Sequence, residues 1–175
     1  MANTPKGNIK SRKIAILAAD GVDGPSLTSI KEVLIAGGAV GKIIAPKGGA
    51  LKTAQGQDLT VDFTFLTAGS VLFDAVYVPD GEVSAATLVT EAKALHFINE
   101  SFNHCKAIGA TGAGVDVLLA SALGGDGDGS REGSLLDSEG IVTSDASQTR
   151  IEEDFIAAVG QHRHWAREQG PRVPA

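Results

Sequence analysis

The sequence predicts an α/β protein built around a parallel sheet that helices cover on both faces. Short, uninterrupted apolar runs alternate along the 175 residues with segments of helical periodicity. Such runs are typical of strands buried on both faces, and strand–helix–strand alternation is typical of right-handed crossovers between parallel strands. Hydrophobic residues make up 43% of the chain and aromatic residues only 5%, which indicates one core of small and branched aliphatic side chains.

The first half of the chain predicts two strands, one helix and a hairpin. Residues 13–19 form the first apolar run and residues 40–45 the second, so both are predicted strands. Between them, apolar residues at positions i, i+3 and i+7 predict a helix over about 26–36, which the glycine pair at 37–38 ends. Alternating apolar and polar residues within 47–65 predict a half-exposed hairpin.

The second half predicts three more strands and three helices. Residues 74–78 form a buried strand, and helical periodicity then runs from about 84 to 104. A strand, a glycine turn and a helix follow within residues 106–121. After a loop rich in glycine and aspartate, residues 141–143 form a last short strand, and apolar residues four apart within 151–159 predict a closing helix.

These elements together predict a single three-layer, flavodoxin-like domain, which is a doubly wound parallel sheet with a small β-hairpin excursion. We place this domain at residues 13–168. The polar residues 1–12 are expected to form a linker or N-terminal extension, and residues 169–175 a C-terminal tail.

Charge and composition exclude several classes of function. The formal net charge of −6 repels phosphate backbones, which argues against nucleic acid as a partner. No apolar run approaches the ~20 residues that cross a bilayer, and the polar N-terminus has no signal-peptide core. We therefore expect a soluble, cytoplasmic protein with no membrane partner. Cys105 is the only cysteine, which excludes an internal disulfide and a multi-cysteine zinc site.

The remaining short motifs favour neither a metal nor a cofactor. Residues 126–130 resemble a calcium loop, but Arg131 stands where that loop needs glycine and Asp137 where it needs glutamate. His162 and His164 are two positions apart and would point away from each other on a helix, so we expect both to be solvated. The loop after the first strand carries two carboxylates, which disfavours a flavin phosphate.

The strongest functional signal is the strand–turn–helix segment at 106–121. In several α/β folds such a turn raises a nucleophile above the sheet, beside the backbone N–H groups that begin the helix. Here Thr111 stands at the turn, followed by Gly112, with neither cysteine nor serine at the tip. A threonine nucleophile would require a general base, and no histidine falls in a predicted carboxyl-edge loop. The segment therefore predicts the frame of an active site without its reactive atom.

Further polar residues are expected at the carboxyl edge of the sheet. Asp20, Asp23 and Ser26 follow the first strand, and Asp80 follows the strand at 74–78. Because ligands of parallel sheets bind beyond the carboxyl ends of the strands, we expect these side chains to surround a cleft beside the turn. Cys105 instead precedes its strand and lies at the opposite edge. We expect a small buried hydrophobe there, with peroxide sensing as the alternative.

Three segments resemble the class I glutamine amidotransferase-like superfamily of the ThiJ/PfpI type, namely residues 15–23, 77–81 and 107–112. In that family the turn, or elbow, carries a cysteine, and a glutamate after the first strand hydrogen-bonds it. On the family's pattern Thr111 or Gly112 takes the place of the cysteine, and Ser26 takes the place of the glutamate. The resemblance therefore implies a degenerate site, without hydrolase or glyoxalase-like activity.

Residues 13–23, 107–112 and 151–165 more closely resemble the carboxy-terminal flavodoxin-like domain of large-subunit catalases, and this likeness extends over the chain from about residue 10. It implies a non-catalytic accessory domain of an enzyme that decomposes hydrogen peroxide to water and oxygen. The haem would belong to a domain absent from this sequence. The implied partners are that haem domain, sister subunits and unfolding client proteins, which the domain would stabilise or shield.

A chaperone-like role requires accessible apolar surface. The candidates are apolar residues of the predicted hairpin and of the run that follows it: Leu51, Leu59, Val61, Phe63, Phe65, Val71, Leu72 and Phe73. Their alternative role is ordinary packing against the core or against the haem domain. The alternative function for the whole chain is a divergent ThiJ/PfpI-type enzyme or a small-molecule-binding domain that uses the carboxyl-edge cleft.

Overall fold

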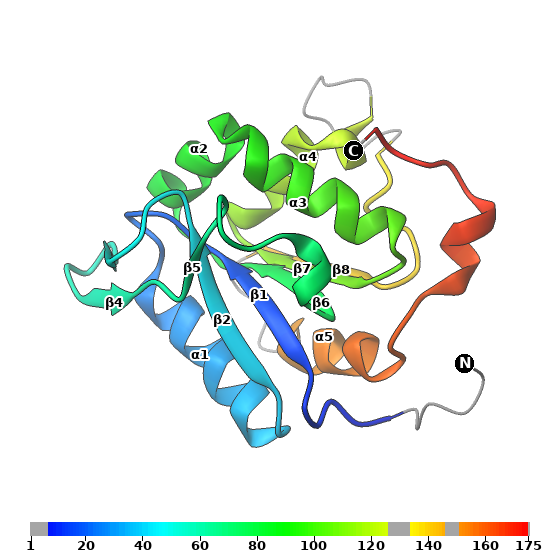
Figure 1. Ribbon diagram of the computed structural model, residues 1–175, viewed down its shortest axis with the longest axis horizontal. Helices are drawn as coiled ribbons and strands as arrows, with labels where there is room; N and C mark the ends of the chain where they lie inside the picture. The colour runs from blue at the N-terminus through cyan, green and yellow to red at the C-terminus, as the bar shows by residue number, and fades with distance from the viewer. Residues whose placement is uncertain (1–6, 126–133, 146–150, 175) are drawn as a thin grey trace.

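The computed structural model describes residues 7–125, 134–145 and 151–174 (Figure 1). Six strands form one parallel sheet in the order β5-β2-β1-β6-β7-β8. These strands are β1 (Lys13–Leu17), β2 (Val40–Ala45), β5 (Phe63–Thr64), β6 (Ala75–Val78), β7 (Ala107–Thr111) and β8 (Ile141–Ser144). The order β2-β1-β6-β7-β8 confirms the predicted doubly wound, flavodoxin-like sheet.

Helices cover both faces of this sheet, as Figure 1 shows. On one face lie α1 (Gly24–Ala36) and α5 (Ile151–Gly160), and on the other α2 (Glu82–Thr90), α3 (Ala92–Asn103) and α4 (Gly114–Ala120). Each face buries its own apolar cluster. The short 3₁₀ helices are η1 (Ser70–Leu72), η2 (Ala122–Gly124) and η3 (Trp165–Gln169).

The apolar runs become central strands because their side chains alternate between the two clusters. In β1, Ala15 and Leu17 pack on the side of α2, α3 and α4, whereas Ile14 and Ile16 pack on the side of α1 and α5. All four side chains are fully buried. A strand with helices on both sides needs apolar residues at every position, which explains why β1 reads as a continuous run rather than as an alternation.

Helix α1 begins where its sequence supplies a cap. The carboxylate of Asp23 accepts a hydrogen bond from the backbone N–H of Ser26 at 2.9 Å, and Pro25 occupies the first turn. An aspartate at this position satisfies one of the free N–H groups at a helix start, and proline there loses no hydrogen bond. These two signals fix the beginning of α1 at the carboxyl edge of β1.

The predicted helix over 84–104 is wrong as a single element, because the structure breaks it at Glu91. That residue is extended (φ −90°, ψ 97°) and ends α2, while its carboxylate accepts from the N–H of Lys93 at the start of α3. The end of α2 is rich in β-branched residues, and the Thr90 hydroxyl donates to the carbonyl of Thr87 at 2.9 Å. Both features weaken a helix, so the chain turns here and lays two shorter helices on the sheet.

The predicted hairpin is confirmed but shorter than expected. Strands β3 (Ala50–Lys52) and β4 (Asp58–Thr60) pair antiparallel and form a separate two-stranded sheet. The predicted hairpin extended to residue 65, but β5 leaves it and pairs in parallel with the end of β2, where Phe63 lies opposite Ile44. The open edge of β2 offers free hydrogen-bonding groups, which the two residues of β5 take up.

The division into linker, domain and tail stays a prediction, although described residues of both flanking segments enter the core. Ile9 is buried in the cluster beneath α1, and Val173 is buried in the cluster on the opposite face. Val173 also exchanges two backbone hydrogen bonds with the side chain of Asn103. None of the helices in the described segments is both long enough and apolar enough to span a bilayer.

Candidate functional site

The elbow between β7 and α4 has a glycine at its tip. Thr111 is the last residue of β7, lies opposite Ser144 of β8 and is largely buried. Gly112 follows with φ of +53°, in the left-handed region that glycine adopts without strain. Of the two residues predicted at the nucleophile position, Gly112 therefore occupies the tip, and it has no side chain with which to attack a substrate.

The carboxylate of Asp80 fills the space above this tip. Its Oδ1 accepts hydrogen bonds from the backbone N–H of Gly81 at 2.7 Å and of Ala113 at 2.8 Å. A Cβ atom on Gly112 would overlap this carboxylate. The backbone N–H of Ala113, which follows the tip and would face a substrate at an elbow of this kind, is thus already bonded to an internal carboxylate.

Asp23 and Ser26 join Asp80 but serve the loops rather than a ligand. The hydroxyl of Ser26 accepts from the backbone N–H of Asp80 at 3.2 Å, and the backbone N–H of Asp23 donates to the carbonyl of Asp80 at 2.8 Å. Asp23 also accepts from the side-chain amide of Gln55 at 2.8 Å, and Gln55 in turn accepts from the N–H of Gly24. Most of the polar capacity of this group is therefore used within the protein.

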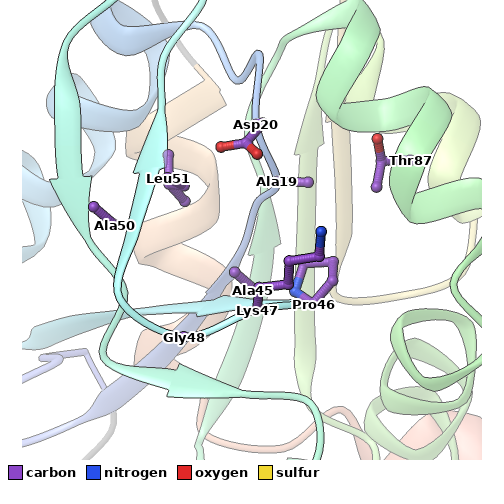
Figure 2. Close-up of a pocket in the computed structure, with 9 residues that line it drawn as sticks. All are labelled: Ala19, Asp20, Ala45, Pro46, Lys47, Gly48, Ala50, Leu51 and Thr87. Atoms are coloured by element: carbon purple, nitrogen blue, oxygen red, sulfur yellow. The ribbon is translucent and has the colours of Figure 1, made fainter.

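Asp20 lies apart from these residues, at a pocket on the carboxyl edge of β1 and β2 (Figure 2). This carboxyl-edge pocket has a volume of about 320 Å³ and is lined by Ala19, Asp20, Ala45, Pro46, Lys47, Gly48, Ala50, Leu51 and Thr87. An adjoining pocket of about 540 Å³ shares Asp20 and Ala50 with it. The structure thus separates the predicted site residues into a filled elbow and a pocket beside Asp20.

The amino edge of the sheet gathers buried charge around Cys105. Cys105 is buried, and burial raises the pKa of its thiol. The positive charge of Arg167 opposes this rise only in part. The ammonium of the neighbouring Lys106 is also buried and donates to the carbonyl of Ser70 at 2.7 Å. Burial, and to a lesser extent the positive charge of Arg163, lowers the pKa of Lys106 to about 8. A buried thiol whose pKa is raised behaves as a small hydrophobe.

The prediction that His162 and His164 are solvated is wrong, and neither residue lies on a helix. Helix α5 ends at Gly160, and the chain then folds across the amino edge of the sheet. His164 is only 1% exposed, and its backbone N–H donates to the carbonyl of Cys105 at 2.8 Å. His162 is half-buried, and its Nδ1 lies 2.6 Å from Nη1 of Arg12. Burial lowers the pKa of the His162 ring, and the positive charge of Arg12 lowers it to a lesser extent.

Three of the residues predicted to form an apolar surface are buried. Leu51, Phe65 and Phe73 are at most 9% exposed and belong to the two core clusters, because the aromatic rings pack on Phe97 of α3. Leu59 and Val61 are half-buried. The remaining candidates are exposed, at 37% for Phe63, 79% for Val71 and 54% for Leu72, and Leu66, which the sequence did not single out, joins them at 75%.

Sequence reasoning missed two residues at this edge. Gln55 sits in the β3–β4 turn and donates to Asp23, a contact between distant residues that leaves no periodic signal in the sequence. Lys47 lies two residues after the end of β2 and lines the carboxyl-edge pocket, so its position after a predicted strand was a signal that the sequence carried. The calcium-like residues 126–130 and Arg131 lie outside the described residues, and within those no group of three His, Cys, Asp or Glu side chains is placed to hold a metal.

The sheet order and the strand–elbow–helix segment define a ThiJ/PfpI-like α/β fold. A ThiJ/PfpI domain protein from Brachyspira murdochii superposes with a TM-score of 0.70 at 19% identity, over 86% of this chain and 96% of that one. The oxidised DJ-1 of Toxoplasma gondii superposes with a TM-score of 0.60 at 19% identity, over 66% and 64% of the two chains. At these identities the likeness shows the fold alone.

The family model for the C-terminal domain found in long catalases matches residues 10–169, and the chain belongs to that family. Catalase HPII of Mycobacterium avium is 42% identical over 172 residues, which cover 95% of this chain and 24% of the relative. Catalase-2 of Bacillus subtilis is 38% identical, over 90% of this chain and 21% of the relative. The chain thus spans under a quarter of the length of these curated relatives.

Proposed function

We propose that this chain is the non-catalytic accessory domain of a haem catalase. The parent would convert two molecules of hydrogen peroxide to two of water and one of oxygen, with the haem held outside the present sequence. One observation carries the non-catalytic part of the proposal: Gly112 and the Asp80 carboxylate stand where a ThiJ/PfpI-type elbow would hold its nucleophile. Family membership supports the link to a catalase.

The domain is proposed to stabilise the parent's subunits and to hold unfolding proteins through an apolar ridge, made of Phe63, Leu66, Val71 and Leu72. All four side chains are exposed and fall within ten residues of one another in the chain. Single exposed apolar residues are common on protein surfaces, but a group of them is typical of an interaction site. The ridge begins in β5, whose outer edge is the end of the sheet. It can therefore face either the haem domain or an unfolded segment.

The test of the holdase role is light scattering from a heat-aggregating client enzyme, with this chain present at equal molar amounts. We expect the wild type to suppress scattering and the triple variant Leu66→Ser/Val71→Ser/Leu72→Ser to lose most of that effect. The matched control is Ile35→Ser, which removes an equally exposed apolar side chain from α1 on the opposite face. Loss of suppression in both variants, or no suppression by the wild type, contradicts the holdase role.

The subunit-stabilising role is tested in the full-length parent. The same triple variant should lower the temperature at which the assembled enzyme dissociates, while the Ile35→Ser parent keeps the wild-type value. Equal dissociation temperatures for all three enzymes would show that the ridge does not stabilise the subunit contacts.

The second candidate function is small-molecule binding at the carboxyl edge. The sequence offered two alternative functions at this edge, a divergent enzyme and a small-molecule-binding domain. The elbow filled by Asp80 disfavours the enzyme. A binding domain is favoured by the open pocket beside Asp20, which is separate from that elbow.

A further inference from the structure

The carboxyl-edge pocket lies where parallel sheets bind ligands. It is formed by the loops that leave β1 and β2, with β3 as one wall and Thr87 of α2 on the opposite side (Figure 2). Loops beyond the carboxyl ends of the strands form the ligand sites of open α/β sheets. Its volume of about 320 Å³ is at the lower end of the range for ligand pockets, so it suits a small molecule.

Two exposed side chains of opposite charge in this pocket make no ion pair within the described residues. Asp20 Oδ1 accepts from the backbone N–H of Lys52 at 2.8 Å, and within the described residues its Oδ2 accepts no hydrogen bond. The Lys47 ammonium likewise makes no hydrogen bond or ion pair within the described residues, and it does not pair with Asp20. Figure 2 shows its side chain directed into the space between Asp20 and Thr87.

This charge pattern decides between classes of ligand. A phosphate would suit Lys47 but would face the Asp20 carboxylate, and a metal cation would suit Asp20 but would face the Lys47 ammonium. A molecule with one ammonium and one carboxylate satisfies both side chains at once. The Thr87 hydroxyl donates to the carbonyl of Val83 at 3.1 Å, so its oxygen is left to accept from a ligand ammonium.

The rest of the lining is apolar. Ala19, Ala45 and Leu51 are buried residues that line the pocket, and Pro46 adds a further apolar side chain. Covering an aliphatic ligand side chain with these groups gains free energy. We propose that the carboxyl-edge pocket binds a small aliphatic α-amino acid, with its ammonium on Asp20 and its carboxylate on Lys47.

The backbone holds Asp20 in place before any ligand arrives. Besides the bond from Lys52 to Asp20, the backbone N–H of Gly21 donates to the carbonyl of Lys52 at 2.7 Å, and that of Ala54 donates to the carbonyl of Val22 at 2.8 Å. These bonds join the loop after β1 to the hairpin. Because Asp20 is fixed in advance, ordering it costs little entropy on binding, which raises affinity.

Titration calorimetry on this chain tests the proposal, with leucine as the probe. We expect saturable binding of leucine and at least about tenfold weaker binding of leucinamide, which lacks the carboxylate, and of 4-methylpentanoate, which lacks the amine. Asp20→Asn keeps an oxygen to accept from Lys52 and removes only the charge. Asp20→Asn and Lys47→Met should each weaken leucine binding at least about tenfold, because each removes one ionic contact.

The matched controls are Asp154→Asn and Lys93→Met, which remove exposed charges from α5 and α3 and should leave leucine binding unchanged. Absence of leucine binding at millimolar concentration overturns the proposal, as does equal binding of 4-methylpentanoate or of inorganic phosphate. The proposal rests on the second candidate function and not on the holdase role. Client light scattering of the Asp20→Asn chain separates the two, because the apolar ridge is intact in that variant.

Discussion

The carboxylate of Asp80 occupies the space that a side chain on Gly112 would need. It is held there by two backbone N–H groups, at 2.7 Å from Gly81 and 2.8 Å from Ala113. The conformation of Gly112, the N–H of Ala113 and the Asp80 carboxylate thus depend on one another. We therefore expect that a cysteine introduced at position 112 alone does not create a working nucleophile.

Substitution of Gly112 should therefore destabilise the fold. Gly112→Ala and Gly112→Cys both place a Cβ against the Asp80 carboxylate and force a left-handed φ of +53° on a residue that resists it. The strain alone costs about 1–3 kcal/mol. Urea unfolding should show at least this loss, and Gly112→Cys should gain no hydrolase activity. The Gly112→Ala/Asp80→Gly double variant should lose less stability than the sum of the two single losses, because the Cβ at position 112 no longer overlaps a carboxylate. Losses that add exactly would contradict a direct contact between the two residues.

Replacement of Asp80 separates its charge from its role as an acceptor. Asp80→Ala leaves the part-buried N–H groups of Gly81 and Ala113 without their partner, and a donor that water does not reach costs about 1–3 kcal/mol. Asp80→Asn keeps an oxygen at the Oδ1 position and should retain most of the stability. Chemical unfolding of the two variants measures the difference, and equal losses would show that the N–H groups find water instead.

The sequence predicted the sheet because its central strands are buried on both faces. β1, β6 and β7 contribute side chains to both apolar clusters. Successive positions of these strands must therefore be apolar, which appears in the sequence as an uninterrupted apolar run. β5 escaped prediction because it is two residues long and exists only through its pairing with β2. The break at Glu91 was missed because the apolar periodicity continues through it.

The candidate site was predictable only where topology alone places residues. Asp23, Ser26 and Asp80 converge because their strands are neighbours and end at the same edge. Lys47 follows β2, the other neighbour of β1, so the same topology places it at this edge, and the sequence reasoning overlooked it. Gln55 could not be found in that way, since its place depends on how the hairpin folds back on the loop after β1. The burial of His164 was missed for a related reason. It lies on a segment without periodic structure that happens to cross the amino edge beside Cys105.

Lys106 should make stability rise with pH above about 8. Burial lowers its pKa from 10.5 to about 8. Below pH 8 the ammonium is charged in both states, and the cost of burying it is fully present. Between about 8 and 10.5 the unfolded chain binds the proton and the folded chain does not, so unfolding becomes harder as pH rises. Above 10.5 the amine is neutral in both states and no cost remains.

The comparison that isolates this effect is wild type against Lys106→Met, by urea unfolding at several pH values. The stability difference should move in favour of the wild type between pH 8 and 10, by no more than about 1.4 kcal/mol per pH unit. Tyr77 and Cys105, whose pKa values burial raises, titrate in both proteins and cancel from the difference. A pH-independent difference would show that the ammonium is neutralised by a partner or reached by water.

The last prediction concerns Cys105, for which peroxide sensing was the alternative to a structural role. The residue is 2% exposed, and burial raises the pKa of the thiol, which lowers the thiolate fraction at neutral pH. Native protein at pH 7 should therefore react with iodoacetamide or hydrogen peroxide far more slowly than protein in urea, as mass spectrometry of the intact chain would measure. Because the positive charge of Arg167 lowers the thiol pKa, Arg167→Met should raise that pKa and slow the reaction of the folded protein further. Rapid oxidation of the folded chain would instead support a sensing role.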